Sequence, residues 1–99
     1  RASFFAPPSH YLLQVCGDSM INVGIFDGDL LAVHSTTEVN EGQIAVVRID
    51  DEVTVKRWKR ISNTRVDLVA ENDDYATIKL DLLEQNVFIE GVSVGVIRR

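Results

Sequence analysis

The sequence predicts an all-β domain. Runs rich in β-branched and aromatic residues recur at short intervals, Gly, Asn and Asp turn signals separate them, and no run has the length and period of an ordinary helix. The chain has 99 residues, of which 45% are hydrophobic and 25% charged. This length allows one domain with a modest core, and the composition excludes collagenous and largely disordered chains.

The chain opens with an expected lead-in arm, residues 1–10, because Pro7-Pro8 favours extended backbone. One domain is expected over residues 11–99. Seven strands are expected at residues 11–16, 29–35, 43–49, 53–61, 65–70, 78–82 and 87–97. A single helical turn is expected at residues 19–24, because Ser is a good N-cap and Gly24 can end a turn.

Two tight turns are expected between these strands. Asp50-Asp51-Glu52 lies between two β-forming runs and predicts a hairpin, because small acidic residues suit turn dihedral angles. Ser62-Asn63-Thr64 predicts a second hairpin, with Asn63 suited to the left-handed backbone conformation.

The charge pattern disfavours binding to nucleic acid. The net charge is −5, although residues 48–65 carry six basic and three acidic side chains. Strand alternation sends Lys56, Trp58 and Arg60 to one face and Arg57 and Lys59 to the other. We therefore expect a solvated strand surface that pairs with acidic side chains, and no direct DNA binding by this domain.

Cys16 is the single cysteine, so it forms neither a disulfide within the chain nor a Cys-based zinc site. It stands in a strand-forming run and is expected in the core. His10 and His34 lie in no ligand-spaced cluster, so neither a metal nor a cofactor is expected. A cytoplasmic location is expected, with no membrane contact: no apolar run approaches a span of roughly 18 residues, and the opening segment is too broken for a signal peptide.

Two residues are candidates for catalysis. Ser19, in Gly17-Asp18-Ser19-Met20, lies where a strand ends and a turn begins, so its hydroxyl neighbours backbone N–H groups able to bind an oxyanion. Taken alone, this pattern is more typical of an N-cap Ser. Lys56 interrupts an apolar strand, where burial would lower its pKa and let it accept the proton of a Ser hydroxyl. Taken alone, a strand Lys usually extends to solvent.

Four motifs, in order, resemble the C-terminal domain of LexA repressors from about Tyr11 to the end of the chain. They are Gly17-Asp18-Ser19-Met20, the segment 24–34 (GIFDGDLLAVH), the segment 49–57 (IDDEVTVKR) and the segment 89–98 (IEGVSVGVIR). The resemblance implies a compact, highly twisted β fold and a self-cleaving serine peptidase. Ser19 would be the nucleophile and Lys56 the general base, with the backbone N–H groups of Asp18 and Ser19 as the oxyanion site and Thr54 orienting the amine.

The resemblance also implies partners. LexA proteins cut an Ala-Gly bond upstream in their own chain when stimulated by RecA filaments on single-stranded DNA. The cut separates the DNA-binding domain from the dimerisation domain and induces the SOS response to DNA damage. This sequence contains no Ala-Gly dipeptide and only eighteen residues before Ser19, so the cleavage segment is expected outside it.

Two alternatives remain open at this point. Gly-Asp-Ser-Met is also typical of UmuD proteins, which are accessories of translesion polymerases, and Asp18 replaces a Met found in many LexA proteins. Cys16-Gly17 resembles the bond cut in UmuD but lies too close to Ser19 to be a substrate. The isolated domain could also be a non-catalytic dimerisation module. Family resemblance places the homodimer contact on the terminal strand, at Val92, Val94 and Val96. Without a partner this strand is expected to be an exposed edge.

Overall fold

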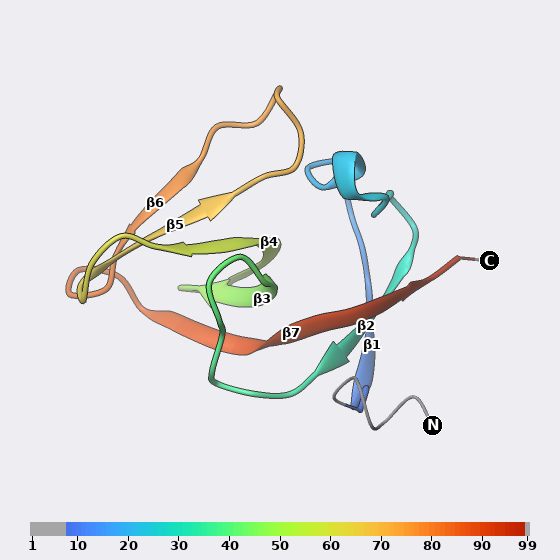
Figure 1. Ribbon diagram of the computed structural model, residues 1–99, viewed down its shortest axis with the longest axis horizontal. Coiled ribbons are helices and arrows are strands. Elements are labelled where there is room, and N and C mark those ends of the chain that lie inside the picture. The colour runs from blue at the N-terminus through green and yellow to red at the C-terminus, as the bar shows by residue number, and fades with distance from the viewer. Residues whose placement is uncertain (1–7, 99) are drawn as a thin grey trace.

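The computed structural model describes residues 8–98, which form one curled antiparallel sheet of seven strands (Figure 1). The strands are β1 (Tyr11–Gln14), β2 (Leu30–His34), β3 (Ile44–Ile49), β4 (Glu52–Arg60), β5 (Arg65–Val69), β6 (Ile78–Asp81) and β7 (Val87–Ile97). Their order is β1-β2-β7-β3-β4-β5-β6, and a short 3-10 helix, η2 (Ile21–Val23), follows β1. The predicted all-β class is confirmed. Within residues 8–98, no helix is long and apolar enough to cross a membrane.

The terminal strand β7 joins the two halves of the sheet and crosses the whole molecule in Figure 1. Residues 87–92 pair with β3, and residues 92–97 pair with β2. At Gly91 a Cβ atom would lie 2.5 Å from the carbonyl oxygen of His34, so only glycine allows the two strands to approach this closely. β7 lies between β2 and β3 but has one neighbour along each half, so among the described residues the 93–97 part pairs with β2 alone and keeps a free edge.

Two apolar clusters lie on opposite sides of β3, because successive side chains of a strand alternate between faces. Val46 belongs to the first cluster, whereas Ala45 and Val47 belong to the second. The first cluster packs beneath the segment between β1 and β2, and its buried members are Val15, Met20, Ile25, Leu31, Val33 and Val46. The second fills the β3–β6 half, and its buried members are Ala45, Val47, Trp58, Val66, Leu68 and Leu80.

The two predicted hairpins are present. Ile49 pairs with Glu52 across the β3–β4 turn, and β4 pairs with β5 beyond residues 62–64. Asp50 has a φ of 54° and is the one non-glycine residue with positive φ in the described part of the chain. Asn63, in the second turn, does not have a positive φ, so the left-handed conformation expected there is wrong.

The expected arm falls mostly on residues 1–7, which lie outside the described residues. Its last part runs beside β2, where the His10 backbone N–H donates to the Val33 carbonyl at 2.7 Å. His34 Nδ1 lies 2.8 Å from the Pro8 carbonyl oxygen.

Candidate active site

Ser19 lies in the loop that links β1 to η2. Gly17 turns the chain with a φ of 90°, and its N–H donates to the Asp27 carboxylate at 2.7 Å. The helical turn is shorter than expected, begins after Met20, and has no side-chain cap, whereas Gly24 ends it in the left-handed conformation as predicted. The N-cap interpretation of Ser19 is therefore wrong, and its hydroxyl is not engaged in capping.

Lys56 lies in the middle of β4 and is buried, with 7% of its surface exposed. Its Nζ donates to Thr54 Oγ1 at 2.6 Å. Burial lowers the pKa of Lys56 below its ordinary value, because desolvation penalises the charged amine. The alternative of a surface Lys extending to solvent is wrong for this residue.

A pocket of about 280 Å³ brings Ser19 and Lys56 together. Its walls come from the end of β1, the loop that carries Ser19 and the first half of β4. The lining residues are Leu13, Gln14, Val15, Cys16, Ser19, Met20, Val53, Thr54, Val55 and Lys56. Within the described part of the chain, no hydrogen bond joins Ser19 Oγ to Lys56 Nζ.

Cys16 is exposed at this pocket, so its predicted place in the core is wrong. The strand β1 ends at Gln14, two residues before its expected end at Cys16. Val15 still points into the core, but the turn at Gly17 carries Cys16 outward.

The backbone beside Ser19 has unused donors. Among residues 8–98, neither the Asp18 nor the Ser19 N–H donates a hydrogen bond, whereas both carbonyls are held. The Asn72 side-chain amide donates to the Asp18 carbonyl at 2.8 Å, and the Glu71 N–H donates to the Ser19 carbonyl at 2.8 Å. Sequence analysis missed Glu71 and Asn72, because a polar segment between two strands carries no sign of its partner.

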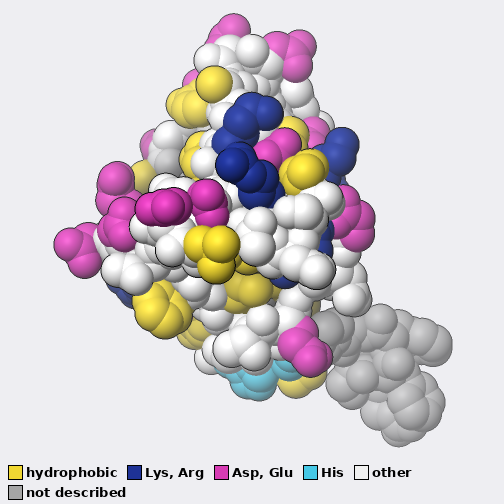
Figure 2. Space-filling view, turned by 90° about the vertical axis from the view of Figure 1, so that its left-hand side faces the viewer, with side chains coloured by type: hydrophobic (Ala, Val, Ile, Leu, Met, Phe, Trp, Pro, Cys, Tyr) yellow, Lys and Arg dark blue, Asp and Glu magenta, His cyan; other side chains and the backbone are white. Residues whose placement is uncertain are grey.

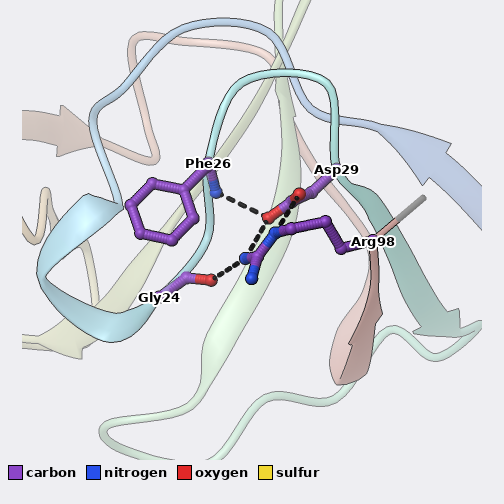
Figure 3. Close-up of polar contacts among 4 residues, drawn as sticks. All are labelled: Gly24, Phe26, Asp29 and Arg98. Atoms are coloured by element: carbon purple, nitrogen blue, oxygen red, sulfur yellow. Dashed lines mark hydrogen bonds and ion pairs between the residues drawn. The ribbon is translucent and has the colours of Figure 1, made fainter.

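An ion pair between the buried carboxylate of Asp29 and the exposed side chain of Arg98 holds the far end of the same loop (Figure 3). Asp29 is 3% exposed, and Arg98 donates to both of its carboxylate oxygens at 2.8 Å. The Phe26 N–H also donates to this carboxylate, and the Arg98 guanidinium lies 4.7 Å from the Phe26 ring and bonds the Gly24 carbonyl. The hydrogen bonds from Arg98, more than any other cause, lower the pKa of Asp29.

Comparison with known proteins identifies the family. The profile of the Peptidase S24-like family matches residues 1–94. The chain belongs to this family. It is 61% identical over 97 residues to a LexA repressor of Ectopseudomonas mendocina (strain ymp), and 59% identical over 99 residues to one of Marinobacter nauticus (strain ATCC 700491 / DSM 11845 / VT8). These matches cover 98% and 100% of the chain but 47% and 48% of the relatives, so this S24-like chain spans about half the length of the curated relatives it matches.

The residues expected at the dimer contact differ in exposure in this S24-like domain. Val92 is 3% exposed and packs inside the protomer, so it is corrected to a core residue. Val94 is half-buried, and Val96 is 39% exposed. Of the three, Val96 is the one most available to a partner.

The surface of the S24-like domain mixes its charges. Figure 2 shows Lys and Arg side chains in the middle of one face, with Asp and Glu side chains around them. On β4, Arg57 is half-buried and pairs with Glu71 at 2.7 Å, whereas Lys59 and Arg60 are exposed. His10 and His34 stack with ring centres 4.7 Å apart, and no group of three or more metal-ligand side chains gathers among residues 8–98.

Proposed function

We propose that this chain is the self-cleaving and dimerising domain of a LexA-like repressor of the SOS response, with Ser19 as nucleophile and Lys56 as general base. One observation carries the proposal: a buried Lys with a lowered pKa lines the same pocket as a Ser beside unused backbone donors. Identity of about 60% to LexA repressors supports the repressor role.

The proposed reaction begins with neutral Lys56. A neutral amine has two donor protons and one lone pair; donation to Thr54 leaves the lone pair free to take the Ser19 hydroxyl proton. As Ser19 Oγ bonds to the scissile carbonyl carbon, the carbonyl oxygen becomes an anion. The backbone N–H groups of Asp18 and Ser19 are the proposed donors to this anion.

The rest of the cycle returns the proton. Collapse of the tetrahedral intermediate breaks the C–N bond, and the Lys56 ammonium protonates the departing amine. Water then attacks the Ser19 ester, Lys56 takes a proton from that water, and the proton passes to Ser19 Oγ as the carboxylic acid leaves. The sum is hydrolysis of one peptide bond, with both side chains restored.

The pocket suits an extended peptide. β1 pairs with β2 alone, and residues 52–56 of β4 pair with β3 alone, so in the described part of the chain both strands have a free edge beside the pocket. Free edges bind peptides by adding a strand. The proposed substrate is an upstream segment of the same protein with an Ala-Gly bond, and the proposed stimulator is a RecA filament on single-stranded DNA.

A cleavage assay in trans tests the dyad. The 99-residue chain is mixed with a synthetic peptide that contains an Ala-Gly cleavage segment, and products are identified by mass spectrometry. Ser19→Ala and Lys56→Ala should abolish cleavage, whereas Ser62→Ala and Lys59→Ala, on exposed positions, should cleave as the wild type does. Retained activity of Ser19→Ala would contradict the dyad. A chain that dimerises but never cuts would instead be a non-catalytic dimerisation module.

We further propose a homodimer through the exposed side of the last part of β7, in a cytoplasmic protein. Val96→Asp should give monomers in sedimentation, because it places a charge in the proposed apolar contact. Leu83→Asp is the control, since Leu83 is 80% exposed and lies between β6 and β7. A wild-type chain that remains monomeric at high micromolar concentration would contradict the dimer.

A further inference from the structure

The loop after β5 holds the backbone around Ser19. Glu71 and Asn72 bond the carbonyls of Ser19 and Asp18, and the Glu71 carbonyl accepts from the Asn22 N–H at 2.8 Å. Glu71 and Asn72 are more than fifty positions away from Asp18 and Ser19 in sequence. The bond from Asn72 is the one in this set that depends on a side chain, so it is the one that substitution can remove.

The Asn72 bond determines the direction of one oxyanion donor. The peptide between Asp18 and Ser19 is trans, as are all those described, so its C=O and its N–H point in opposite directions within one plane. When Asn72 holds the Asp18 carbonyl at 2.8 Å, it also fixes where the Ser19 N–H points. That N–H points away from Asn72 and has no other partner among the described residues.

Asn72 is itself fixed in place. It is 8% exposed, and its side-chain oxygen accepts from the Asp74 N–H at 3.0 Å. Because the side-chain oxygen accepts from Asp74, the NH₂ group faces the Asp18 carbonyl. In the reverse orientation the NH₂ group would face the Asp74 N–H and the side-chain oxygen would face the Asp18 carbonyl, so neither bond could form. The Glu71 carboxylate accepts from Arg57 Nε at 2.7 Å, which ties this loop to β4 beside Lys56.

From this geometry we propose that Asn72 is a positioning residue of the active site: its side-chain amide orients the Asp18–Ser19 peptide so that the Ser19 N–H serves as an oxyanion donor. The inference rests on the proposed peptidase function. Asn72 touches neither of the reacting groups and acts through the peptide it holds.

Substitution of Asn72 tests the inference by separating kcat from KM. Asn72→Asp keeps the acceptor for Asp74 but sets a carboxylate oxygen against the Asp18 carbonyl, and Asn72→Ala removes the donor without adding charge. Because the oxyanion develops only after the substrate has bound, in the transition state and the tetrahedral intermediate, both variants should lower kcat for the Ala-Gly peptide by at least about tenfold and leave KM within about twofold. Asn63→Asp, the same change in an exposed turn, should cleave as the wild type does.

A transition-state mimic gives a second readout. A peptide boronic acid becomes tetrahedral when its boron bonds Ser19 Oγ, and one boron-bound oxygen then needs the oxyanion donors. Both Asn72 variants should weaken its binding by about the factor lost in kcat, and should leave binding of an uncleavable peptide of the same sequence unchanged. The pH at which cleavage rises should also be unchanged, because Lys56 determines it.

Defined results would overturn the inference. Folded Asn72 variants with a wild-type kcat, or with a raised KM and unchanged kcat, would show that the amide does not orient the donor. If neither variant folds, the inference is tested on the wild-type chain with the boronate bound. Rapid solvent exchange of the Asn72 side-chain amide protons, measured by NMR, would overturn the inference. An active Ser19→Ala variant would contradict the peptidase proposal itself. If Ser19→Ala is inactive but the Asn72 variants cleave as the wild type does, this inference alone is contradicted.

Discussion

Ser19 and Lys56 line one pocket, but different parts of the fold place them there. Lys56 is in the middle of the nine-residue strand β4, and continuous pairing with β3 holds its backbone. Ser19 lies in the segment between β1 and β2, in which η2 is the one regular element and has three residues. The backbone around Ser19 is instead fixed by Asp27, Glu71 and Asn72.

This difference shows how far each half of the site depends on local sequence. Strand pairing positions a side chain through backbone bonds that most sequences can make, so we expect the position of Lys56 to tolerate changes in its neighbours. The Ser19 loop depends in part on two particular side chains, Asp27 within the loop and Asn72 after β5, and each of these contacts can be lost by one substitution. The predictions below test this contrast in order of decreasing effect.

Lys56→Met should have the largest effect, and it should remove cleavage without destabilising the fold. Cleavage of the Ala-Gly peptide should stop, because a thioether accepts no proton, while the free energy of unfolding at pH 7 should be unchanged or higher because a buried amine is removed. Cleavage assays and urea unfolding on the same samples measure both. Lys59→Met, exposed on the same strand, is the control and should keep wild-type activity.

The pH dependence of stability provides a second measurement on these samples. The folded pKa of Lys56 lies below the ordinary value of 10.5, so between the two values the unfolded chain binds more protons. The free energy of unfolding should therefore rise with pH across that window, by at most about 1.4 kcal/mol per pH unit from this one group. The difference between wild type and Lys56→Met isolates this rise, and a constant difference from pH 7 to 10 would contradict the lowered pKa.

The same contrast explains how much could be predicted from the sequence. The seven strands follow from β-forming runs and turn residues, so their positions and that of Lys56 were predictable. The core position of Cys16 and the N-cap role of Ser19 were predicted wrongly. Both depend on where the chain turns after β1: the turn at Gly17, bound to Asp27, carries Cys16 outward, and the helical turn begins only after Met20.

Asn72 and Arg98 show the same limit within the site. Asn72 stands in a polar loop and Arg98 at the end of a strand, and nothing in the sequence around them indicates a carbonyl at Asp18 or a carboxylate at Asp29. Polar partners of this kind become visible only when the fold brings the segments together. The local residue patterns and the family resemblance identified the dyad candidates but not these supporting residues.

Gly91→Ala should destabilise the crossing of β2 and β7, on which both halves of the pocket rest. The new Cβ would lie 2.5 Å from the His34 carbonyl oxygen and 2.6 Å from Val33 Cγ1, so the strands must separate. We expect a loss of about 1–3 kcal/mol in urea unfolding, typical of overpacking. Gly95→Ala, on the same strand with no atom within 4 Å of its new Cβ, should change stability little, and equal losses in both would contradict the close approach.

Arg98→Ala should loosen the Ser19 side of the site more than the Lys56 side. It leaves the buried Asp29 carboxylate with the Phe26 N–H as its remaining charge-stabilising donor, so the melting temperature at pH 7 should fall. Arg65→Ala is the control, because the Arg65–Asp81 pair is 3.9 Å apart and Arg65 is 62% exposed. Equal melting temperatures for the two variants would contradict the special role of Arg98.

The acid limb of stability should respond to the same variant. Arg98 holds the folded pKa of Asp29 below its ordinary value of 3.8, so this ion pair stabilises the fold above that pH and its contribution is lost as pH falls through the lowered value. The wild-type advantage over Arg98→Ala should therefore shrink under strongly acidic conditions. An advantage that grows as pH falls would contradict the sign of this linkage.

Asp50→Asn should have the smallest effect and tests the local encoding of the hairpin that carries Lys56. Asp50 has a φ of 54°, a conformation that Asn adopts more readily than Asp does, and the substitution also removes one of three adjacent negative charges. We expect the free energy of unfolding, measured with urea, to rise by about 0.5 kcal/mol, with cleavage unchanged.

Asp51→Asn is the control. It makes the same change of charge at a residue without positive φ, so the difference between the variants isolates the backbone contribution. If Asp51→Asn is as stable as Asp50→Asn, charge alone accounts for the gain. The turn would then not depend on a residue suited to the left-handed conformation, and the strand that carries Lys56 would owe its register to pairing with β3 alone.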